Sequence, residues 1–200
     1  MPRVPRRPAA LPRALGRRLA KIRLVVCDVD GVLTDGGLLY DSQGGVSKRF
    51  DVHDGQGLSK LVRAGIGVVF LSGETAPAVE ARARKVGVTD VRQGVVDKRR
   101  ELDDIAARHG VATREILYVG DDEPDLPVMR AVGVAVAVAD AVPAVIAAAH
   151  WVTARPGGRG AVREVAERLL AARTGLARAS GRHAGGEGGG TPPRPDERLS

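Results

Sequence analysis

Aromatic residues are scarce in this chain, at 2% of its 200 residues. Surfaces that bind single-stranded nucleic acid stack bases on aromatic rings, so the scarcity argues against such a platform. The core must instead be built from Val, Leu, Ile and Ala. The rest of the composition is typical of one globular domain, because 44% of the residues are hydrophobic and charges of both signs are mixed.

The sequence also lacks a second cysteine and any long hydrophobic run. Cys27 is the one cysteine, which excludes an internal disulfide, and its apolar neighbours indicate a small core residue rather than a nucleophile. The longest apolar run, residues 132–139, is interrupted by Gly133 and is too short for a signal peptide or a membrane span. We therefore expect a cytoplasmic protein without a membrane partner.

The net charge of +7 arises at the two ends of the chain. Residues 1–21 contain seven Arg and Lys and no acidic residue, residues 176–200 contain four basic and three acidic residues, and residues 22–175 contain 20 basic and 21 acidic residues. A basic leader could bind nucleic acid or an anionic membrane. Its Arg- and Pro-rich composition favours a largely disordered, solubilising leader, and the Gly/Pro/Arg tail after residue 175 is also predicted to be disordered. Residues 22–175 then form the domain, and no nucleic-acid partner is predicted.

Strand-like and helix-like segments alternate through this domain. Predicted strands cover residues 22–27, 67–72, a short stretch near Val91, 116–119, 134–138 and 151–152. Predicted helices cover residues 13–21, 55–64, 75–86, 97–109, 125–131 and 160–173. A glycine-containing turn between two β-prone runs predicts a β-hairpin over residues 37–51. The pattern is typical of an α/β fold, a three-layer Rossmann-like parallel sheet, here with a hairpin flap that overhangs the end of the first strand.

Two carboxylates follow the first predicted strand. Asp28 and Asp30 come directly after the apolar run 22–27, and ligands of open α/β sheets bind outside the carboxyl ends of the strands. Residues two apart on an extended segment point the same way, and Gly31 lets the chain turn away without a side chain in the crevice. Such a cluster favours a hard divalent cation. The alternative is a solvated turn at the strand end.

Three further polar sites follow later strands. Ser72 and Gly73 end a buried strand before a helix, where a hydroxyl and free backbone amides can bind an anion. Lys98 opens another helix and offers a positive charge to a phosphoryl group. Residues 120–125, GDDEPD, form a second carboxylate cluster. Each feature alone could be a helix cap, a solvated lysine or a turn, but their order after successive strands indicates phosphoryl transfer.

The run DVDGVLT, which begins at Asp28, resembles the first motif of the haloacid dehalogenase superfamily of phosphotransferases. The other three sites match the remaining motifs of that superfamily. The resemblance implies that Asp28 is the nucleophile that carries an aspartyl phosphate, and that Asp30 is the general acid and base. It also implies that Ser72, the amide of Gly73 and Lys98 hold the phosphate oxygens.

The same resemblance implies a Mg²⁺ cofactor. Asp28, the backbone carbonyl of Asp30 and Asp121 would hold the ion, and Asp122 or Asp125 would orient its ligands. The cation would offset the repulsion between an anionic nucleophile and a phosphate dianion. Mn²⁺ is an alternative because it takes the same oxygen ligands.

More of the chain, about residues 21–175, resembles a narrower group, the 3-deoxy-D-manno-octulosonate 8-phosphate (KDO 8-phosphate) phosphatase family. The likeness lies in the hairpin and in the runs DVHDG at 51–55, GDDEPDLPVM at 120–129, VAVADA at 136–141 and GGRGAVRE at 157–164. Members lack a large cap domain, and they are typically homotetramers in which hairpins and arginine loops close neighbouring sites. The resemblance implies that Arg159 helps to bind the sugar acid. A flexible link before the last helix is the alternative for that loop.

One position departs from the pattern of this family. Octulosonate phosphatases usually carry Arg after the Ser/Thr-Gly of the second motif, where this chain has Glu74. Lys85 lies eleven residues further on, about three helical turns, and so on nearly the same helix face. The pair resembles relatives that act on nine-carbon acids, such as 2-keto-3-deoxynononic acid 9-phosphate. An ordinary solvated pair is the alternative.

Two classes of function therefore stay open. The first is a Mg²⁺-dependent phosphatase that releases a 3-deoxy-2-ulosonic acid from its terminal phosphate, with either an eight- or a nine-carbon substrate. The second is a non-catalytic partner of a cytidylyltransferase or another enzyme, because a fold alone does not fix a function. The intact Asp28, Asp30, Lys98 and Asp121 favour the first.

Overall fold

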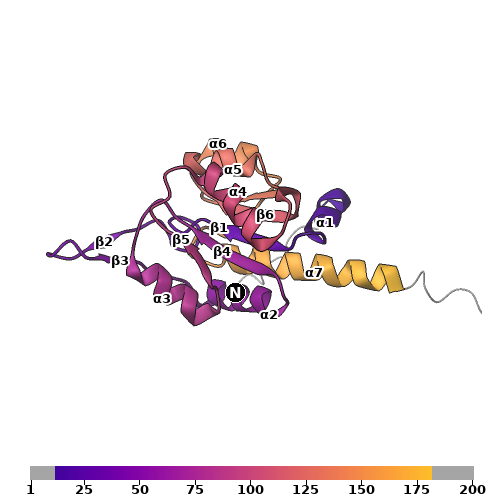
Figure 1. Cartoon of the computed structure of the whole chain (residues 1–200), viewed down its shortest axis with the longest axis horizontal. Coiled ribbons are helices and arrows are strands. Elements are labelled where there is room, and N and C mark those ends of the chain that lie inside the picture. Colours follow the sequence, from indigo (N-terminus) through magenta and orange to yellow (C-terminus); the bar gives the residue numbers. More distant parts are fainter. Residues whose placement is uncertain (1–11, 182–200) are drawn as a thin grey trace, which may run out of the picture.

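A six-stranded parallel sheet forms the centre of this computed structural model, which describes residues 12–181 (Figure 1). The strand order is β5-β4-β1-β6-β7-β8. The strands are β1 (Leu24–Cys27), β4 (Gly67–Leu71), β5 (Asp90–Arg92), β6 (Ile116–Gly120), β7 (Val134–Ala137) and β8 (Trp151–Val152). All four residues of β1 are buried because the strand lies in the middle of the sheet and is covered on both faces.

Helices cover both faces of the sheet (Figure 1). The helices α2 (Val52–Arg63), α3 (Pro77–Val86) and α7 (Ala161–Gly181) pack together on one face. The helices α4 (Lys98–His109), α5 (Leu126–Met129) and α6 (Pro143–Ala148) lie on the other. The predicted three-layer α/β fold is confirmed. Among residues 12–181, no helix has both the length and the apolar character that crossing a membrane requires.

The register of the central strands brings their carboxyl ends together. Cys27, the last residue of β1, pairs with Phe70 of β4 on one side and with Val119 of β6 on the other. The residues that follow these three strands therefore meet at one edge of the sheet. That edge receives Asp28 after β1, Ser72 after β4 and Asp121 after β6.

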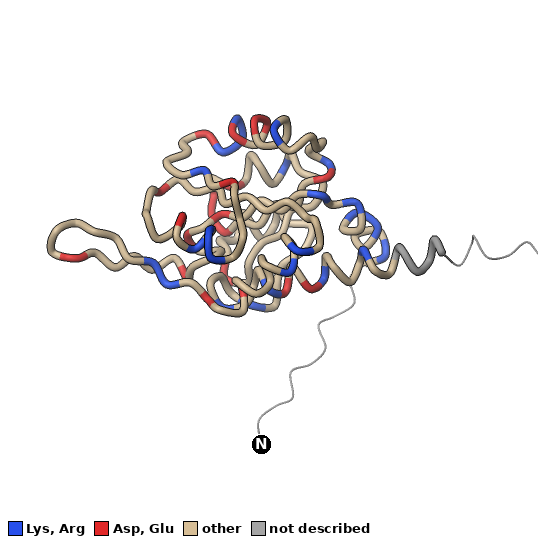
Figure 2. The backbone as a smooth tube through the Cα atoms, turned by 60° about the horizontal axis from the view of Figure 1, so that its bottom comes forward, with Lys and Arg blue, Asp and Glu red and all other residues tan. Residues whose placement is uncertain are grey.

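The hairpin predicted after the first strand is present. The strands β2 (Leu39–Tyr40) and β3 (Val46–Ser47) pair antiparallel and project from the body of the molecule (Figure 1). At the tip, the Asp41 carboxylate accepts hydrogen bonds from two backbone amides of the turn, at 2.8 Å each. Basic residues gather where the hairpin joins the body (Figure 2). No other insertion in residues 12–181 forms a cap.

Both ends of the domain extend further than the sequence predicted. The helix α1 (Arg13–Leu19) lies beside α7, and its Leu15 and Leu19 are buried in the core. The helix predicted over residues 13–21 is thus present, and its leucines, four apart, give it an apolar face. At the other end α7 continues to Gly181, past the predicted start of the tail. Residues 1–11 and 182–200 lie outside the described part.

Candidate active site

Asp28 lies at the first turn after β1, and its position depends on the glycine that follows. Asp28 is buried, and its backbone amide donates to the carbonyl of Val119 at 3.0 Å. Gly31 has a φ of 90°, which favours glycine. A Cβ there would lie 1.9 Å from Oδ2 of Asp121, so the glycine also makes room for that carboxylate. The hydroxyl of Thr34 accepts from the Gly31 amide at 3.3 Å and braces the turn.

Asp30 lies beside the base of the hairpin. Lys48, which directly follows β3, donates from Nζ to both carboxylate oxygens of Asp30 at 2.6 Å. The Ser72 hydroxyl lies 3.3 Å from Oδ2 of Asp30 and accepts from the Glu74 amide at 3.1 Å. Ser72 is itself buried. The first two predicted motifs thus meet on one carboxylate, and a hairpin lysine joins them.

Lys98 enters the site from the start of α4. Asp97 caps the helix by accepting from the Arg100 amide at 3.0 Å, which makes Lys98 the first helical residue. Val96 is fully exposed, whereas Lys98 is buried. Its Nζ lies 2.8 Å from Oδ1 of Asp28 and 2.8 Å from Oδ1 of Asp125. The alternative of a solvated helix lysine is therefore wrong.

Asp125 holds the fourth motif together. Its Oδ1 accepts from Lys98 and from the Tyr118 hydroxyl, at 2.8 Å and 2.6 Å. Its Oδ2 accepts from the backbone amides of Asp121 and Asp122, at 2.9 Å and 3.4 Å. Gly120 leaves the room for this inward turn, since a Cβ there would lie 2.4 Å from Oδ2 of Asp125. Asp125 is therefore a buried acceptor for four donors.

Three carboxylates lie close enough to hold a metal ion. Asp28, Asp121 and Asp125 each offer an oxygen within 4.8 Å of the others. Both oxygens of Asp125 are already engaged, whereas Oδ1 of Asp121 is buried and has no hydrogen-bond partner within the described residues. A buried oxygen without a donor is costly, and a hard cation would satisfy it. The donor set fits a divalent cation, with Asp125 better placed to orient Asp121 than to bind metal.

The pKa values of two of these carboxyls express the crowding of negative charge. Burial, and then the charge of Asp125, raise the pKa of Asp28 to about 6, against the opposing effect of Lys98. Burial, followed by the charges of Asp28 and Asp125, raises the pKa of Asp121 to about 8. Burial alone would lower the pKa of the Lys98 ammonium, but the charges of Asp28 and Asp125 outweigh it and raise that pKa. The cluster lacks positive charge, which is what a cation would supply.

Asp122, the other residue considered for orienting the metal ligands, lies apart from the cluster. Its side chain is exposed, and its Oδ1 accepts from the Glu123 amide at 2.8 Å. It caps the short helix η2 (Glu123–Asp125) that turns Asp125 inward. Of the two alternatives, the geometry favours Asp125.

The two residues predicted to select the substrate do not share a helix. Glu74 is exposed and precedes α3, which begins at Pro77, while Lys85 is in the last turn of that helix. The premise that eleven residues return Lys85 to the same helix face is therefore wrong, because Glu74 is not helical. No hydrogen bond or ion pair joins the two side chains within residues 12–181. Their role in specificity stays a prediction.

Arg159 lies on a loop that packs against the first motif. The amide of Gly158 donates to the Val32 carbonyl at 2.9 Å, and a Cβ at Gly157 would lie 1.6 Å from the carbonyl oxygen of Gly31. The loop is thus a fitted part of the catalytic edge, and the alternative of a flexible link is wrong. The guanidinium of Arg159 is exposed and lies 3.4 Å from Asp35.

Two residues of this site were missed by sequence reasoning. Tyr118 belongs to β6, where an aromatic side chain in an apolar strand indicates only core. Lys48 is one of several basic residues in the sequence around the hairpin. The predicted position of the hairpin, over the end of the first strand, could have indicated Lys48. The second strand of such a hairpin returns toward the domain and brings the residues that follow it back to the end of β1.

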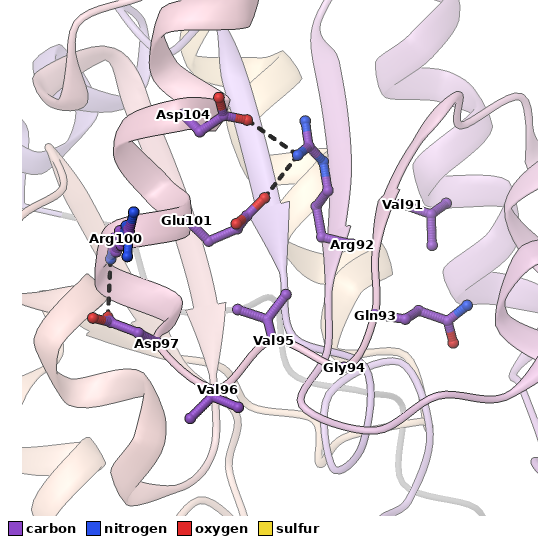
Figure 3. Close-up of a pocket in the computed structure, with 10 residues that line it drawn as sticks. All are labelled: Val91, Arg92, Gln93, Gly94, Val95, Val96, Asp97, Arg100, Glu101 and Asp104. Carbon is purple, nitrogen blue, oxygen red and sulfur yellow. Dashed lines mark hydrogen bonds and ion pairs between the residues drawn. The ribbon is translucent and has the colours of Figure 1, made fainter.

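A separate pocket of about 790 Å³ lies along the loop 93–97 that precedes α4 (Figure 3). It is lined by residues of β5, of the loop 93–97 and of α4. Its Arg92 is already bound by Glu101 at 2.7 Å and by Asp104 at 3.1 Å. None of the carboxylates of the acidic cluster lines it, so this pocket is distinct from the candidate active site.

Comparisons with known proteins find relatives over most of the chain. A family model described as haloacid dehalogenase-like hydrolase matches residues 83–163. The chain is 43% identical over 165 residues to the 3-deoxy-D-manno-octulosonate 8-phosphate phosphatase of Yersinia pestis, covering 82% of this chain and 88% of the relative. The crystal structure of the Yersinia pestis phosphatase superposes with a TM-score of 0.78, at 42% identity, over 81% of this chain and 88% of the other.

A second solved structure was determined with bound ligands. It is the 3-deoxy-D-manno-octulosonate 8-phosphate phosphatase of Moraxella catarrhalis in complex with a magnesium ion, a phosphate ion and KDO. It is 33% identical to this chain, with a TM-score of 0.79, over 86% of this chain and 98% of the other. These similarities extend over most of both chains, so they concern the whole domain and not one motif.

Proposed function

Since this chain belongs to the 3-deoxy-D-manno-octulosonate 8-phosphate phosphatase family of haloacid dehalogenase-like hydrolases, we propose that it hydrolyses the terminal phosphate of a 3-deoxy-2-ulosonic acid phosphate. Membership of this family makes it a phosphoric monoester hydrolase. The observation that carries the proposal is the setting of Asp28, a buried carboxylate 2.8 Å from Lys98 and beside the unpartnered oxygen of Asp121.

In the first step Asp28 acts as the nucleophile. One of its carboxylate oxygens attacks phosphorus, the bond between phosphorus and the sugar oxygen breaks, and Asp30 gives its proton to the departing alkoxide. The products are the free sugar acid and an aspartyl phosphate on Asp28. Asp30 is partly exposed and contacts Lys48 and Ser72, whereas Asp28 is buried, which supports this division of roles.

In the second step water hydrolyses the aspartyl phosphate. Asp30, now a carboxylate, takes a proton from water as the water oxygen attacks phosphorus. The bond between phosphorus and the Asp28 oxygen breaks, which releases inorganic phosphate and restores both carboxyls to their starting states. Splitting one difficult displacement into two easier ones is the advantage of a covalent intermediate.

Three groups would hold the phosphate oxygens in both steps. Lys98 has three N–H donors and uses two of them on Asp28 and Asp125, so one is left for a phosphate oxygen. The Ser72 hydroxyl and the amide of Gly73 lie at the end of β4, next to Asp30. These donors would stabilise the charge that builds on the equatorial oxygens.

Mg²⁺ is the cofactor that we assign to the cluster, with Asp28, the carbonyl of Asp30 and Asp121 as its protein ligands. When bound, it supplies positive charge that lets an anionic nucleophile approach a phosphate dianion. Asp125 would keep the loop that carries Asp121 in place, because it accepts hydrogen bonds from the backbone amides of Asp121 and Asp122. The unpartnered Asp121 oxygen is the feature of this chain that supports the assignment.

The preferred sugar acid, the assembly and the location belong to the same proposal. Glu74 and Lys85 favour testing a nine-carbon 9-phosphate beside the eight-carbon KDO 8-phosphate, and Arg159 is the proposed contact for the sugar acid. We further propose a cytoplasmic homotetramer. Exposed Leu39 and Tyr40 on the hairpin support an assembly, because apolar side chains on a projecting ribbon are commonly covered by a neighbour.

The test is phosphate release from the 8-phosphate and the 9-phosphate side by side, with Mg²⁺ and with a chelator, and with Asp28→Asn as the blank. We expect metal-dependent release from one substrate, well above the blank. A preference for the nine-carbon substrate that Glu74→Arg reverses would establish the role of Glu74. No release from either substrate would overturn the proposal and favour a non-catalytic partner of a cytidylyltransferase or another enzyme.

A further inference from the structure

The side chain of Lys48 is buried at the base of a hairpin whose other residues are exposed or half-buried. Its side chain is 1% exposed, and its Nζ lies 2.6 Å from each oxygen of the Asp30 carboxylate. A lysine is rarely buried so fully unless its charge is paired. The pair therefore ties one end of β3 to one carboxylate of the candidate active site.

Arg49, the next residue, differs from Lys48 in both its partner and its exposure. Arg49 binds Asp35, which also lies 3.4 Å from Arg159, and its side chain is 58% exposed. The Arg49 hydrogen bond holds the pKa of Asp35 below its ordinary value. Both basic residues dock the hairpin onto the loop after β1, but only Lys48 reaches a residue with a chemical role.

Asp30 needs such a contact because its own surroundings fix it weakly. Its side chain is 22% exposed, and besides Lys48 it meets the Ser72 hydroxyl at 3.3 Å, a long hydrogen bond. With one long hydrogen bond as its only other side-chain contact, the carboxyl group of Asp30 could rotate about its side-chain torsions. In the carboxylate form, which takes the proton from water, one ammonium holds both oxygens of Asp30. In the acid form one oxygen carries the proton, and the other keeps the hydrogen bond from Lys48.

We propose that Lys48 is a positioning residue for Asp30, so that its ammonium sets the geometry of the proton transfers. The inference rests on the proposed function, in which Asp30 is the general acid and base. A misplacement of about 1 Å in a catalytic group can cost roughly 100-fold in rate. Losing Lys48 should therefore slow the steps that use Asp30, and leave the attack by Asp28 largely intact.

The experiment compares Lys48→Met with Lys48→Arg and with Arg49→Met as the matched control. Lys48→Met keeps the length of the side chain but removes its charge. Lys48→Arg restores a bidentate donor, and Arg49→Met loosens the docking of the hairpin without touching Asp30. Each variant is assayed on the sugar acid phosphate that the wild type prefers and on p-nitrophenyl phosphate.

The two substrates separate the proposed role from a general structural one. An alkyl phosphate needs Asp30 to protonate its leaving group, so Lys48→Met should lower kcat by about 10- to 100-fold with little change in KM. p-Nitrophenolate leaves without a proton. Its release in the first turnover should stay within about threefold of wild type in Lys48→Met, followed by slow turnover limited by hydrolysis of the aspartyl phosphate. Lys48→Arg should recover much of the rate, and Arg49→Met should behave like wild type.

Several outcomes would overturn the inference. Equal losses in Lys48→Met and Arg49→Met would mean that the hairpin acts only by docking. A loss of the p-nitrophenolate burst would place Lys48 in the attack step, and a rise in KM at constant kcat would make it a substrate contact. If Lys48→Met lowers Tm, the test still holds. The p-nitrophenolate released in the first turnover and the later rate of turnover come from the same folded molecules, so their ratio does not depend on how much protein is folded. A wild type that cleaves neither substrate would refute the proposed function itself.

Discussion

The acidic cluster at the carboxyl ends of β1 and β6 and the hairpin β2–β3 are built on opposite principles. In the cluster Asp28 and Asp125 are buried and Asp121 is half-buried, and Asp125 is held by four donors. In the hairpin Leu39 and Tyr40 are 69% and 67% exposed, and the strands are two residues long. A two-stranded ribbon of this length is marginal by itself. The cluster is rigid because of its own contacts, whereas the hairpin takes its position from the domain through its base.

The two regions differ because the cluster buries charged groups and the hairpin does not. Buried carboxylates and a buried ammonium are costly unless every donor and acceptor is satisfied, so the cluster tolerates little displacement. The hairpin keeps its backbone in solvent and meets no such penalty. We expect substitutions in the cluster to change activity or stability strongly, and substitutions near the hairpin tip to change little.

The largest effect should come from Asp28→Asn. The amide cannot attack phosphorus, so turnover should fall by roughly 10⁴-fold or more. The fold should survive, because Lys98 keeps its contact with Asp125 and one of several crowded negative charges is removed. Phosphate release and a thermal melt in chelator would measure the two effects, with Tm equal to that of the wild type or higher. Unchanged turnover would disprove the role of Asp28.

Asp125→Asn should be the most destabilising change in the cluster. It leaves the Lys98 ammonium with one carboxylate and puts an amide where four donors meet. Removing one partner of a buried pair costs about 3 kcal/mol or more in the free energy of unfolding. Denaturant unfolding would measure this loss. Asp122→Asn is the matched control, since Asp122 is exposed and caps a short helix, and it should change unfolding much less.

Metal and pH should act together on the cluster. The folded pKa values of Asp28 and Asp121 are raised from 3.8 to about 6 and about 8, so the folded protein holds these protons more tightly than the unfolded chain. Their contribution to stability is present below pH 4 and is lost as pH rises through 6 to 8. In chelator, Tm should therefore be lower at pH 8 than at pH 5.

Mg²⁺ should reverse that trend. At pH 8 fewer protons compete for the carboxylates, so the ion should raise Tm more at pH 8 than at pH 5. Ligand at 100 times its Kd contributes about 2.7 kcal/mol, which is roughly 5–10 °C for a chain of this size. Calorimetry at both pH values, with Mg²⁺ and with chelator, would measure the shift. An equal rise of Tm in Asp121→Asn would show that the ion binds elsewhere.

Asp41→Ala at the tip of the hairpin should give the smallest effect. It removes two hydrogen bonds to turn amides that are exposed to water, so the free energy of unfolding should change by about 0.5 kcal/mol or less. Turnover should also stay at the wild-type rate, because Lys48 and the base of the hairpin are untouched. A loss of activity in Asp41→Ala would mean that the tip, and not only the base, takes part in the reaction.

The sequence predicted the cluster better than its surroundings. Asp28, Ser72, Lys98 and Asp121 could be placed together because each follows a recognisable strand, and parallel strands end at one edge. Lys48 could not be placed in the site, because its contact with Asp30 depends on how the hairpin folds back over the end of β1. The alternation of strands and helices implies a parallel sheet. That one inference predicted both the three layers and the edge at which the site lies.

Helix boundaries were less predictable because they depend on single caps. The helix α2 begins at Val52, three residues earlier than predicted, since Asp51 accepts from the His53 and Asp54 amides at 2.6 Å and 3.2 Å. The helix α1 was predicted, over residues 13–21, although it lies in a leader of basic composition. Burial of Leu15 and Leu19 against the end of the domain outweighs that composition.

The bond between Tyr118 and Asp125 gives this protein an optical reporter. The sequence contains two tyrosines, and they fall in the two regions compared above, Tyr118 buried in the cluster and Tyr40 exposed on the hairpin. Phenol absorbance is sensitive to the charge of a hydrogen-bond acceptor and to solvent. Changes in the near-ultraviolet spectrum can thus be traced to one region by replacing a single ring with Phe, so cation binding and hairpin contacts can each be followed without a label.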